Sequence, residues 1–320
     1  MSEVSVPLSP RERLVGALTD AGYGAAWTLA KTVPDALLRP VFATAAGLAV
    51  YRRGRGVVQL SRNLARVTGR DPDIGLADPA MRRLVGQAMS SYARYWLETF
   101  RLPVMNLETV LAGTTTTGVE KLWAARDRGP VVVALPHSGN WDIAGVWLLS
   151  RGCRFTTVVE RLKPESLFER FVRYRESLGM EVIALSGTAE SPSALLRQRL
   201  QDGGMVCLVA DRDLSGGGVK VDFFGAPARM PAGPALLAAA TGAQLLPVHL
   251  YFQGTGWGQE IGDPIDLGAG RLRDQVSWGT QQLANFFASR IRQHPADWHM
   301  LQRLWEADFS VPPSSDSRVV

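Results

Sequence analysis

The sequence predicts an α/β protein in which helices cover both faces of a mixed, mostly parallel central sheet, with a helical element at the N-terminus. Three observations lead to this class. After Gly129, short β-branched or apolar runs alternate with amphipathic helical segments, which is the order of βαβ units. Residues 11–111 contain helix signals and no strand signals. A chain of 320 residues with 46% hydrophobic and 20% charged residues is typical of a folded globular protein.

The helical element precedes the alternating segments. Apolar residues spaced by three or four positions predict a first helix between residues 11 and 30, and Pro34 opens a second one. Residues 79–100 start with proline after Asp78 and repeat apolar side chains on one face, so we expect a helix buried on that face. We divide the chain into a helical segment (1–111), an α/β core (112–308) and a disordered polar tail (309–320), with a single structural domain as the alternative.

The core is predicted segment by segment. Each apolar or β-branched run is short enough for a strand, and each amphipathic run is long enough for a helix. The run VVVAL at 131–135 has no polar residue, which predicts a buried strand. The expected strands are 130–135, 154–159, 180–185, 205–210, 219–224 and 244–252, and the expected helices are 141–150, 164–179, 190–202, 232–241 and 273–293.

Cysteine usage and missing motifs narrow the function classes. Cys153 and Cys207 lie in apolar surroundings and form no C-x-x-C pair, so we interpret them as free buried thiols in a reducing compartment. With four histidines and no H-E-x-x-H, no metal site is predicted. The absence of a G-x-S-x-G elbow, a Walker loop and a complete G-x-G-x-x-G argues against serine-elbow hydrolases and nucleotide-dependent enzymes. We find no cleaved signal sequence and no uninterrupted apolar run of 18 residues.

The basic excess is confined to the N-terminal part. Residues 1–70 hold ten Lys or Arg and four Asp or Glu, whereas residues 71–320 hold 25 and 26. Between Asp35 and Asp71 arginines are interleaved with apolar residues and no acidic residue occurs, which is typical of a helix on an anionic membrane surface. A helical cap with solvated arginines is the alternative. Nucleic acid would accept the same charge, but nothing else resembles a nucleic-acid-binding module, so no such partner is predicted.

The segment PHSGNWD joins the buried strand 131–135 to the next helix and contains the main candidate for chemistry. Open α/β sheets bind ligands at the carboxyl ends of their strands, and His137 follows such an end. Residues 138–140 supply turn and N-cap residues, so free N–H groups are expected there for an anion or oxyanion. Asp142 is expected to accept a hydrogen bond from His137 and to orient it as a general base. A histidine that only caps or bridges the structure is the alternative.

The block HSGNWD resembles the H-x-x-x-x-D signature of glycerolipid acyltransferases, in the version of the bacterial lipid A lauroyl and myristoyl acyltransferases. The resemblance covers residues 90–308 well and the N-terminal helices more loosely. Within this family the chain resembles the phosphatidylinositol mannoside acyltransferases of mycobacteria and related actinobacteria. The other agreeing blocks are ERLKPESLFERFVRYRESLG (160–179), ADRDL (210–214), VDFFGAPARMPAGPALLAAATGA (221–243), LLPVHL (245–250) and HPADWHMLQRLW (294–305).

The resemblance implies an acyltransferase that moves a long-chain, palmitoyl-type group from acyl-CoA to a mannose hydroxyl of a phosphatidylinositol mannoside. It implies direct attack of the hydroxyl on the thioester, without covalent enzyme intermediate, cofactor or metal. It also implies a peripheral protein on the cytoplasmic face of the plasma membrane. The alternatives are an acyltransferase for another acceptor, such as lysophosphatidate, and a non-catalytic lipid-binding protein.

The resemblance also assigns residues. His137 would be the general base and Asp142 its orienting partner. Glu160, Arg175 and Asp211 fall in blocks that line the active-site groove and would position substrate, and the related mannoside acyltransferases have Glu in place of Asp211. The structural alternatives are a salt bridge on a helix surface for Arg175 and a helix cap for Glu160.

Further basic residues surround the glycine-rich stretch 215–218. Arg212, Lys220 and Arg229 would meet phosphates of CoA or of the inositol lipid, and a solvated loop explains them equally well. The remaining histidines are predicted to be structural, and these are His249, His294 and His299.

Overall fold

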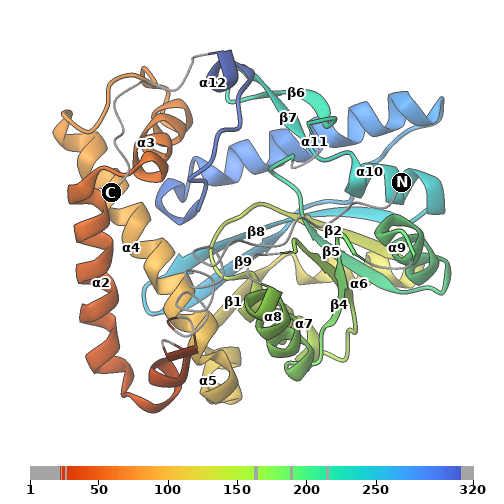
Figure 1. The fold of residues 1–320 in the computed structure, drawn as a ribbon. Coiled ribbons are helices and arrows are strands. Elements are labelled where there is room, and N and C mark those ends of the chain that lie inside the picture. Colours follow the sequence, from red (N-terminus) through yellow and green to blue (C-terminus); the bar gives the residue numbers. More distant parts are fainter. Residues whose placement is uncertain are drawn as a thin grey trace.

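A seven-stranded sheet forms the centre of the computed structural model, which describes residues 22, 24, 25, 27–161, 165–187, 190–213 and 216–310 (Figure 1). The strand order is β1-β9-β8-β2-β5-β3-β4, and every neighbouring pair is parallel except β8 with β9. This confirms the predicted α/β class with a mostly parallel sheet. The strands are β1 (Thr114–Thr117), β2 (Val131–Leu135), β3 (Thr156–Val159), β4 (Glu181–Ala184), β5 (Met205–Val209), β8 (Gln244–Gln253) and β9 (Gly256–Ile261).

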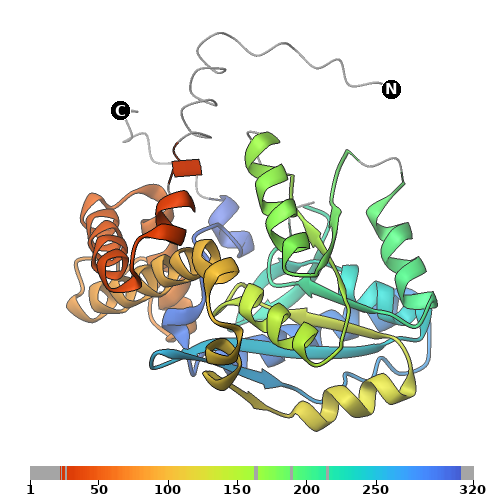
Figure 2. The ribbon, with the colours of Figure 1, turned by 90° about the horizontal axis from the view of Figure 1, so that it is seen from below.

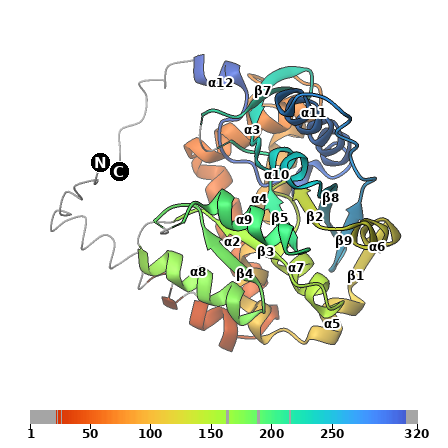
Figure 3. The same cartoon turned by 90° about the vertical axis from the view of Figure 1, so that its right-hand side faces the viewer.

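Helices cover both faces of this sheet (Figure 3). In β2, Val132 and Ala134 belong to the apolar cluster under α9, α10 and α11, whereas Val131, Val133 and Leu135 belong to the cluster under α6 and α7. Because successive side chains of a strand point to opposite faces, the apolar run at 131–135 is buried on both sides. The helices are α6 (Val119–Arg128), α7 (Trp141–Ser150), α8 (Glu165–Ser177), α9 (Pro192–Gln201), α10 (Gly233–Thr241) and α11 (Leu272–Ile291).

The N-terminal helices form a separate layer at one end of the sheet (Figure 2). Helix α4 (Pro79–Arg101) begins as predicted, because the Asp78 side chain accepts a hydrogen bond from the Met81 backbone N–H. Helix α2 (Asp35–Arg52) runs beside α4 on its outer side, and α3 (Arg55–Val67) packs on α4 as well. The short α5 (Leu107–Ala112) leads into β1.

Arg94 of α4 ties this layer to the end of β8. Its guanidinium donates to the carbonyls of Gly254, Thr255 and Gly256 at 2.7–2.9 Å. Helix α4 therefore lies across the carboxyl end of β8, next to the end of β2 where His137 is found. None of the described helices combines the length and the apolar composition needed to cross a membrane.

A small hairpin and the residues after α11 pack together beside α11. A two-stranded antiparallel hairpin, β6 (Val219–Phe223) and β7 (Ala226–Met230), lies outside the main sheet and packs with α12 (Glu306–Ser310). A 3-10 turn at Pro295–Asp297 leads back toward the site. Phe223, Trp298 and Trp305 are fully buried together in this region.

Most expected elements are found close to their expected bounds. The strands β1, β7 and β9 and the helix α6 were not predicted, and the segment 219–224, predicted as a strand, belongs to the hairpin outside the main sheet. Phe309 and Ser310 end helix α12, and the rest of the predicted disordered tail, 311–320, lies outside the described residues. Most of the predicted first helix also lies outside them, although residues 27–32 are helical. Cys153 and Cys207 are free thiols, as predicted.

Candidate active site

The turn between β2 and α7 holds His137 at the end of a central strand. The Asn140 side chain caps α7 by accepting the Ile143 backbone N–H at 3.1 Å. Gly139 has φ +57°, and a Cβ there would lie 2.7 Å from backbone atoms of Leu250 and Tyr251. Only glycine fits both this conformation and this close approach to β8. The turn is therefore packed tightly against the neighbouring strand, which fixes the backbone of His137.

Asp211 is the hydrogen-bond partner of His137. Its Oδ1 lies 2.6 Å from His137 Nδ1, and its Oδ2 accepts the His137 backbone N–H at 2.9 Å. A third donor, the indole N–H of Trp298, reaches Oδ2 at 2.8 Å. Asp211 lies two residues beyond β5, the strand that pairs with β2, so the two side chains meet at the same edge of the sheet.

The Asp211 carboxyl is fully buried and yet remains ionised. Burial raises its pKa, but the attraction of His137 and the hydrogen bonds from His137 and Trp298 outweigh burial, so the pKa is lowered overall. An ionised carboxylate accepts the proton on Nδ1 of His137, which leaves the lone pair on Nε2. The His137 side chain is 33% exposed, and among the described residues no hydrogen-bond partner is recorded for Nε2. His137 can therefore accept a proton from outside.

The predicted hydrogen bond between His137 and Asp142 is wrong. Asp142 lies in the first turn of α7, where its buried Oδ1 accepts a hydrogen bond from Arg175 Nε at 2.8 Å. Thr99 of α4 approaches its Oδ2 at 3.5 Å. The physical reason is that α7 starts between the two residues. His137 faces the end of β5, while the helix directs Asp142 toward α8 and α4.

Arg175 forms an ion pair across two helices, so neither sequence interpretation of it was complete. Its side chain is only 11% exposed, and it links α8 to Asp142 of α7. Burial alone would lower the pKa of the guanidinium, but attraction to Asp142 and hydrogen bonding to it raise the pKa overall. A buried ion pair of this kind holds α8 in place beside the site.

An apolar cavity of about 100 Å³ lies beside this ion pair, between α7 and the sheet. Asp142 and Arg175 are its charged lining residues, and Trp141, which contacts His137 with ring centroids 5.8 Å apart, also lines it. The rest of the wall is mostly apolar and comes from α7 and from strands of the main sheet. Examples are Val133, Leu135, Leu148, Phe155, Met180, Cys207, Val209, Val248 and Leu250.

Two of the expected N–H donors in the turn are already used. The Ser138 N–H donates to the Pro136 carbonyl at 2.8 Å, and the Gly139 N–H donates to the Asp297 carbonyl at 3.0 Å. The expectation that residues 138–140 offer their N–H groups is therefore wrong for Ser138 and Gly139. No acceptor is recorded within the described residues for the N–H groups of Asn140 and Trp141.

The other predicted site residues stay at the periphery. Glu160 is exposed at the carboxyl end of β3, and Arg212 is half-buried after Asp211. For neither side chain is a hydrogen bond or ion pair recorded within the described residues, so the structure does not join them to His137. The helix-cap alternative for Glu160 involves residues 162–164, which lie outside the described residues. Lys220 and Arg229 form ion pairs with Glu306 of α12 at 3.3 and 3.5 Å.

Sequence reasoning missed Glu98, which connects α4 to the turn between β2 and α7. This buried carboxylate accepts hydrogen bonds from Arg94, from the Asn140 side chain and from the Trp257 indole at 2.6–2.9 Å. It thus holds the residue that caps α7. The only signal in the sequence was an acidic residue near the end of a helix that otherwise repeats apolar side chains.

The histidines of the C-terminal part are close to the site. His299 is buried, its Nε2 lies 3.1 Å from Ser91 Oγ, and its backbone N–H donates to the His137 carbonyl at 2.7 Å. Burial lowers the pKa of His299 to about 3, so the ring stays neutral. His249 is fully buried with Nδ1 3.3 Å from Ser138 Oγ, while its Nε2 has no hydrogen-bond partner among the described residues.

The chain is similar over nearly its whole length to known proteins. The family model described as bacterial lipid A biosynthesis acyltransferase matches residues 11–307. A Mycolicibacterium smegmatis protein named phosphatidylinositol mannoside acyltransferase is 49% identical over 304 residues, which are 95% of this chain and 96% of that protein. A Mycobacterium tuberculosis protein of the same name is 47% identical over 315 residues, 96% of this chain and 95% of the relative.

Proposed function

The chain belongs to the family of bacterial lipid A biosynthesis acyltransferases and is an acyltransferase, and from this we propose that it moves a long-chain acyl group from acyl-CoA to a mannose hydroxyl of a phosphatidylinositol mannoside. The acceptor is supported by the printed names of relatives that are 47–49% identical along nearly the full chain. The chemistry is supported by one observation above all. His137 exposes Nε2 while Asp211 holds its other ring nitrogen.

In the proposed reaction, Nε2 of His137 takes the proton of the mannose hydroxyl as its oxygen attacks the thioester carbonyl carbon. The Asp211 carboxylate stabilises the imidazolium that forms. The tetrahedral intermediate then collapses, the C–S bond breaks, and the imidazolium returns its proton to the CoA sulfur. The N–H groups of Asn140 and Trp141 are the donors available at the start of α7 for the negative oxygen of that intermediate.

The first carbons of the acyl chain would occupy the apolar cavity beside α7. Trp141, which contacts His137, lines this cavity together with residues of α7 and of the main sheet. Burying one methylene group contributes about 0.8 kcal/mol, so the mostly apolar wall favours the hydrocarbon part of an acyl group. Arg175 and Asp142 are the charged residues of the same wall.

A transfer assay with the purified full chain tests this function. Radiolabelled palmitoyl-CoA and phosphatidylinositol mannoside are supplied to the wild type and to His137→Ala, and we expect the substitution to reduce transfer about 10²–10⁴-fold because the base is lost. His294→Ala is the matched control. His294 stacks on Tyr251 with ring centroids 4.0 Å apart and takes no part in the His137–Asp211 pair, so transfer should remain near wild type.

The assay also separates the alternatives. Transfer to lysophosphatidate but not to the mannoside would reject the proposed acceptor and keep the acyltransferase. An undiminished rate in His137→Ala would reject the proposed base. If no acceptor is acylated while acyl-CoA and lipid still bind, the protein is a lipid-binding member of the family.

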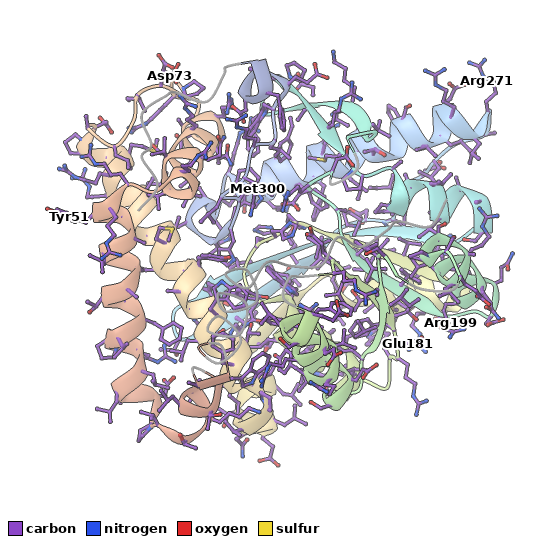
Figure 4. All side chains as sticks on the ribbon, viewed as in Figure 1. Tyr51, Asp73, Glu181, Arg199, Arg271 and Met300 are labelled. Atoms are coloured by element: carbon purple, nitrogen blue, oxygen red, sulfur yellow. The ribbon has the colours of Figure 1, made fainter. Side chains whose placement is uncertain are left out.

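We further propose that α2 docks the protein on the cytoplasmic face of the plasma membrane as a peripheral protein. Helix α2 is apolar around most of its circumference, but only one side of it packs on α4. On the other side Leu37 is 62% exposed and Tyr51 84% exposed, together with Val41 and Leu48. Figure 4 shows Tyr51 projecting outward from this helix. An apolar helix face left uncovered beside cationic residues is typical of an interfacial helix.

The arginines of this region divide into two groups. Four of them form ion pairs with carboxylates of the same chain, and these pairs are Arg39 with Asp35, Arg62 with Asp73, Arg66 with Asp308 and Arg70 with Asp78. Arg52, Arg53 and Arg55 are exposed, and no carboxylate partner is recorded for them within the described residues. These three arginines stand at the end of α2 and would contribute about 1 kcal/mol each on an anionic surface.

Vesicle sedimentation tests the docking proposal. The variant with Arg52, Arg53 and Arg55 all changed to Glu should leave vesicles that contain anionic phospholipid at moderate salt, where the wild type stays bound. The control reverses three exposed arginines, Arg197 of α9, Arg273 of α11 and Arg271 just before α11, which changes the net charge equally at the opposite end of the molecule. Equal binding of both variants would reject α2 as the docking face.

A further inference from the structure

The segment after α11 crosses the catalytic turn and pairs with its backbone. The Gly139 N–H donates to the Asp297 carbonyl at 3.0 Å, and the His299 N–H donates to the His137 carbonyl at 2.7 Å. Between them Ser138 and Trp298 form an antiparallel bridge. Residues 297–299, which we call the strap, thus follow the turn residue by residue although they lie some 160 positions later in the chain.

Trp298 is the strap residue that reaches the reacting pair. Its backbone bridges Ser138, and its indole Nε1 donates to Asp211 Oδ2 at 2.8 Å. The ring is fully buried against Phe223 and Trp305, so its position is set by packing. Asp211 is also fully buried. Among the described residues, its carboxylate has three recorded donors, which are this indole N–H and the backbone and ring N–H groups of His137.

We propose that Trp298 is a positioning residue, which acts through Asp211 and sets the pH range in which His137 works as a base. The proposal rests on the function proposed above for His137. The indole N–H holds Oδ2 in place, so that Oδ1 points at Nδ1 of His137. It also takes up part of the carboxylate's negative charge, which limits how strongly that charge holds a proton on the imidazole.

Charge near the carboxylate supports this role. The hydrogen bond from Trp298 is one of the interactions that lower the pKa of Asp211 against the effect of burial. The titratable groups that face Asp211 are His137 from the turn and His299 from the strap, and His299 stays neutral because burial lowers its pKa to about 3. Without the indole N–H, less of the carboxylate's negative charge is compensated, and that charge acts more strongly on His137.

The experiment compares two buried tryptophans. Trp298→Phe keeps an aromatic ring and removes the N–H, and we expect kcat/KM to fall about 10-fold to 100-fold, the usual effect of losing a hydrogen bond to a charged group. The acid limb of the pH profile should move to higher pH, because the imidazolium is then held more strongly. Trp305→Phe is the matched control, since Trp305 is equally buried in the same cluster and donates its N–H to the Phe223 carbonyl at 2.8 Å.

A second variant keeps the test decisive if phenylalanine disturbs folding. At position 298 the sulfur analogue of tryptophan, in which the ring N–H is replaced by S, preserves the ring shape and removes only the donor. We expect the same shift of the acid limb, with a melting temperature close to that of the wild type. Trp305→Phe should lower the melting temperature and leave the acid limb in place.

The outcomes separate this proposal from the proposed function. If His137→Ala is inactive but both variants at position 298 keep the wild-type acid limb, Trp298 is only a packing residue and the inference is overturned. If Trp305→Phe moves the acid limb as much as Trp298→Phe, the effect is a general result of loosened packing, and the inference is again overturned. If His137→Ala remains active, the failure lies with the proposed base.

Discussion

Two buried aspartates, one just beyond β5 and one in the first turn of α7, have different partners. Asp211, at the edge formed by β2 and β5, holds the imidazole of His137. Asp142, at the interface of α7 and α8, holds the guanidinium of Arg175. Both carboxylates are almost completely buried. Their different partners show that burial and residue type do not define a role.

The comparison separates the histidine and the aspartate of the H-x-x-x-x-D pattern in this chain, His137 and Asp142. His137 is the base of the proposed reaction, whereas Asp142 pairs with Arg175 of α8 and lines the apolar cavity. Asp142 would then act on the reaction through the position of α8 and of the cavity wall. The role of Asp211 can be tested by the rate of acyl transfer, and the role of Asp142 by the free energy of unfolding.

The largest expected effect follows from Asp211→Asn. The amide cannot stabilise the imidazolium, so we expect kcat to fall about 10²–10⁴-fold while the fold remains. Asp211→Glu is the companion variant, because it restores a carboxylate, and it should retain more activity than Asn. Steady-state kinetics with acyl-CoA and the mannoside measures both. Equal loss in Asn and Glu would mean that the charge at this position is unimportant.

Asp142→Ala should affect stability first. It leaves Arg175 buried without its counter-charge, which typically lowers the free energy of unfolding by about 3–5 kcal/mol. The double variant Asp142→Ala/Arg175→Met removes both charges and should recover much of that loss. Urea unfolding of the single and double variants decides the matter. A stable Asp142→Ala protein with strongly reduced kcat would instead place Asp142 in the reaction itself.

A smaller effect is expected from the backbone of the catalytic turn. Gly139→Ala introduces a Cβ that clashes with the backbone of Leu250 and strains a positive φ, and we expect a loss of about 1–3 kcal/mol together with slower transfer. Gly152→Ala is the control, because Gly152 also has a positive φ of +75° but has open space around its Cβ position. If the two variants are equally stable and equally active, close packing of the turn on β8 is not required.

The smallest expected effect is a dependence of stability on acid pH. The Asp211 pKa is lowered in the folded state, so its contribution is fully present above the unfolded value near about 4 and is lost as the pH falls through the folded value. Glu181, whose pKa is lowered by its hydrogen bonds to Arg199 and Thr156, contributes in the same direction. Urea unfolding from neutral pH down to about pH 3 should show a smaller loss in Asp211→Asn than in the wild type. Parallel curves would contradict the contribution of Asp211.

Local chemistry made much of the fold predictable. Proline after Asp78 marks the start of α4, and the unbroken apolar run at 131–135 marks a central strand. His137 could be placed at a strand end because the turn residues and the N-cap follow it directly. The strands β1 and β9 were missed because their sequences, TTTT and GWGQEI, carry little of the apolar pattern that marks a strand.

The partners of the site residues could not be predicted in the same way. Asp142 was the expected partner of His137 because it is near in sequence, while Asp211 and Trp298 lie 74 and 161 positions away. The sequence likewise revealed the positive charge of the segment between Asp35 and Asp71. Only the structure shows that Arg66 forms an ion pair with Asp308 while Arg52 is exposed.

By itself the sequence determined where most helices and strands begin, which strand is buried and that His137 follows the end of that strand, since periodicity, caps and turns depend on adjacent residues. The tertiary structure decided which carboxylate meets the imidazole. That choice depends on β5 lying beside β2 and on the strap crossing the turn, and both follow from packing the whole chain around one core.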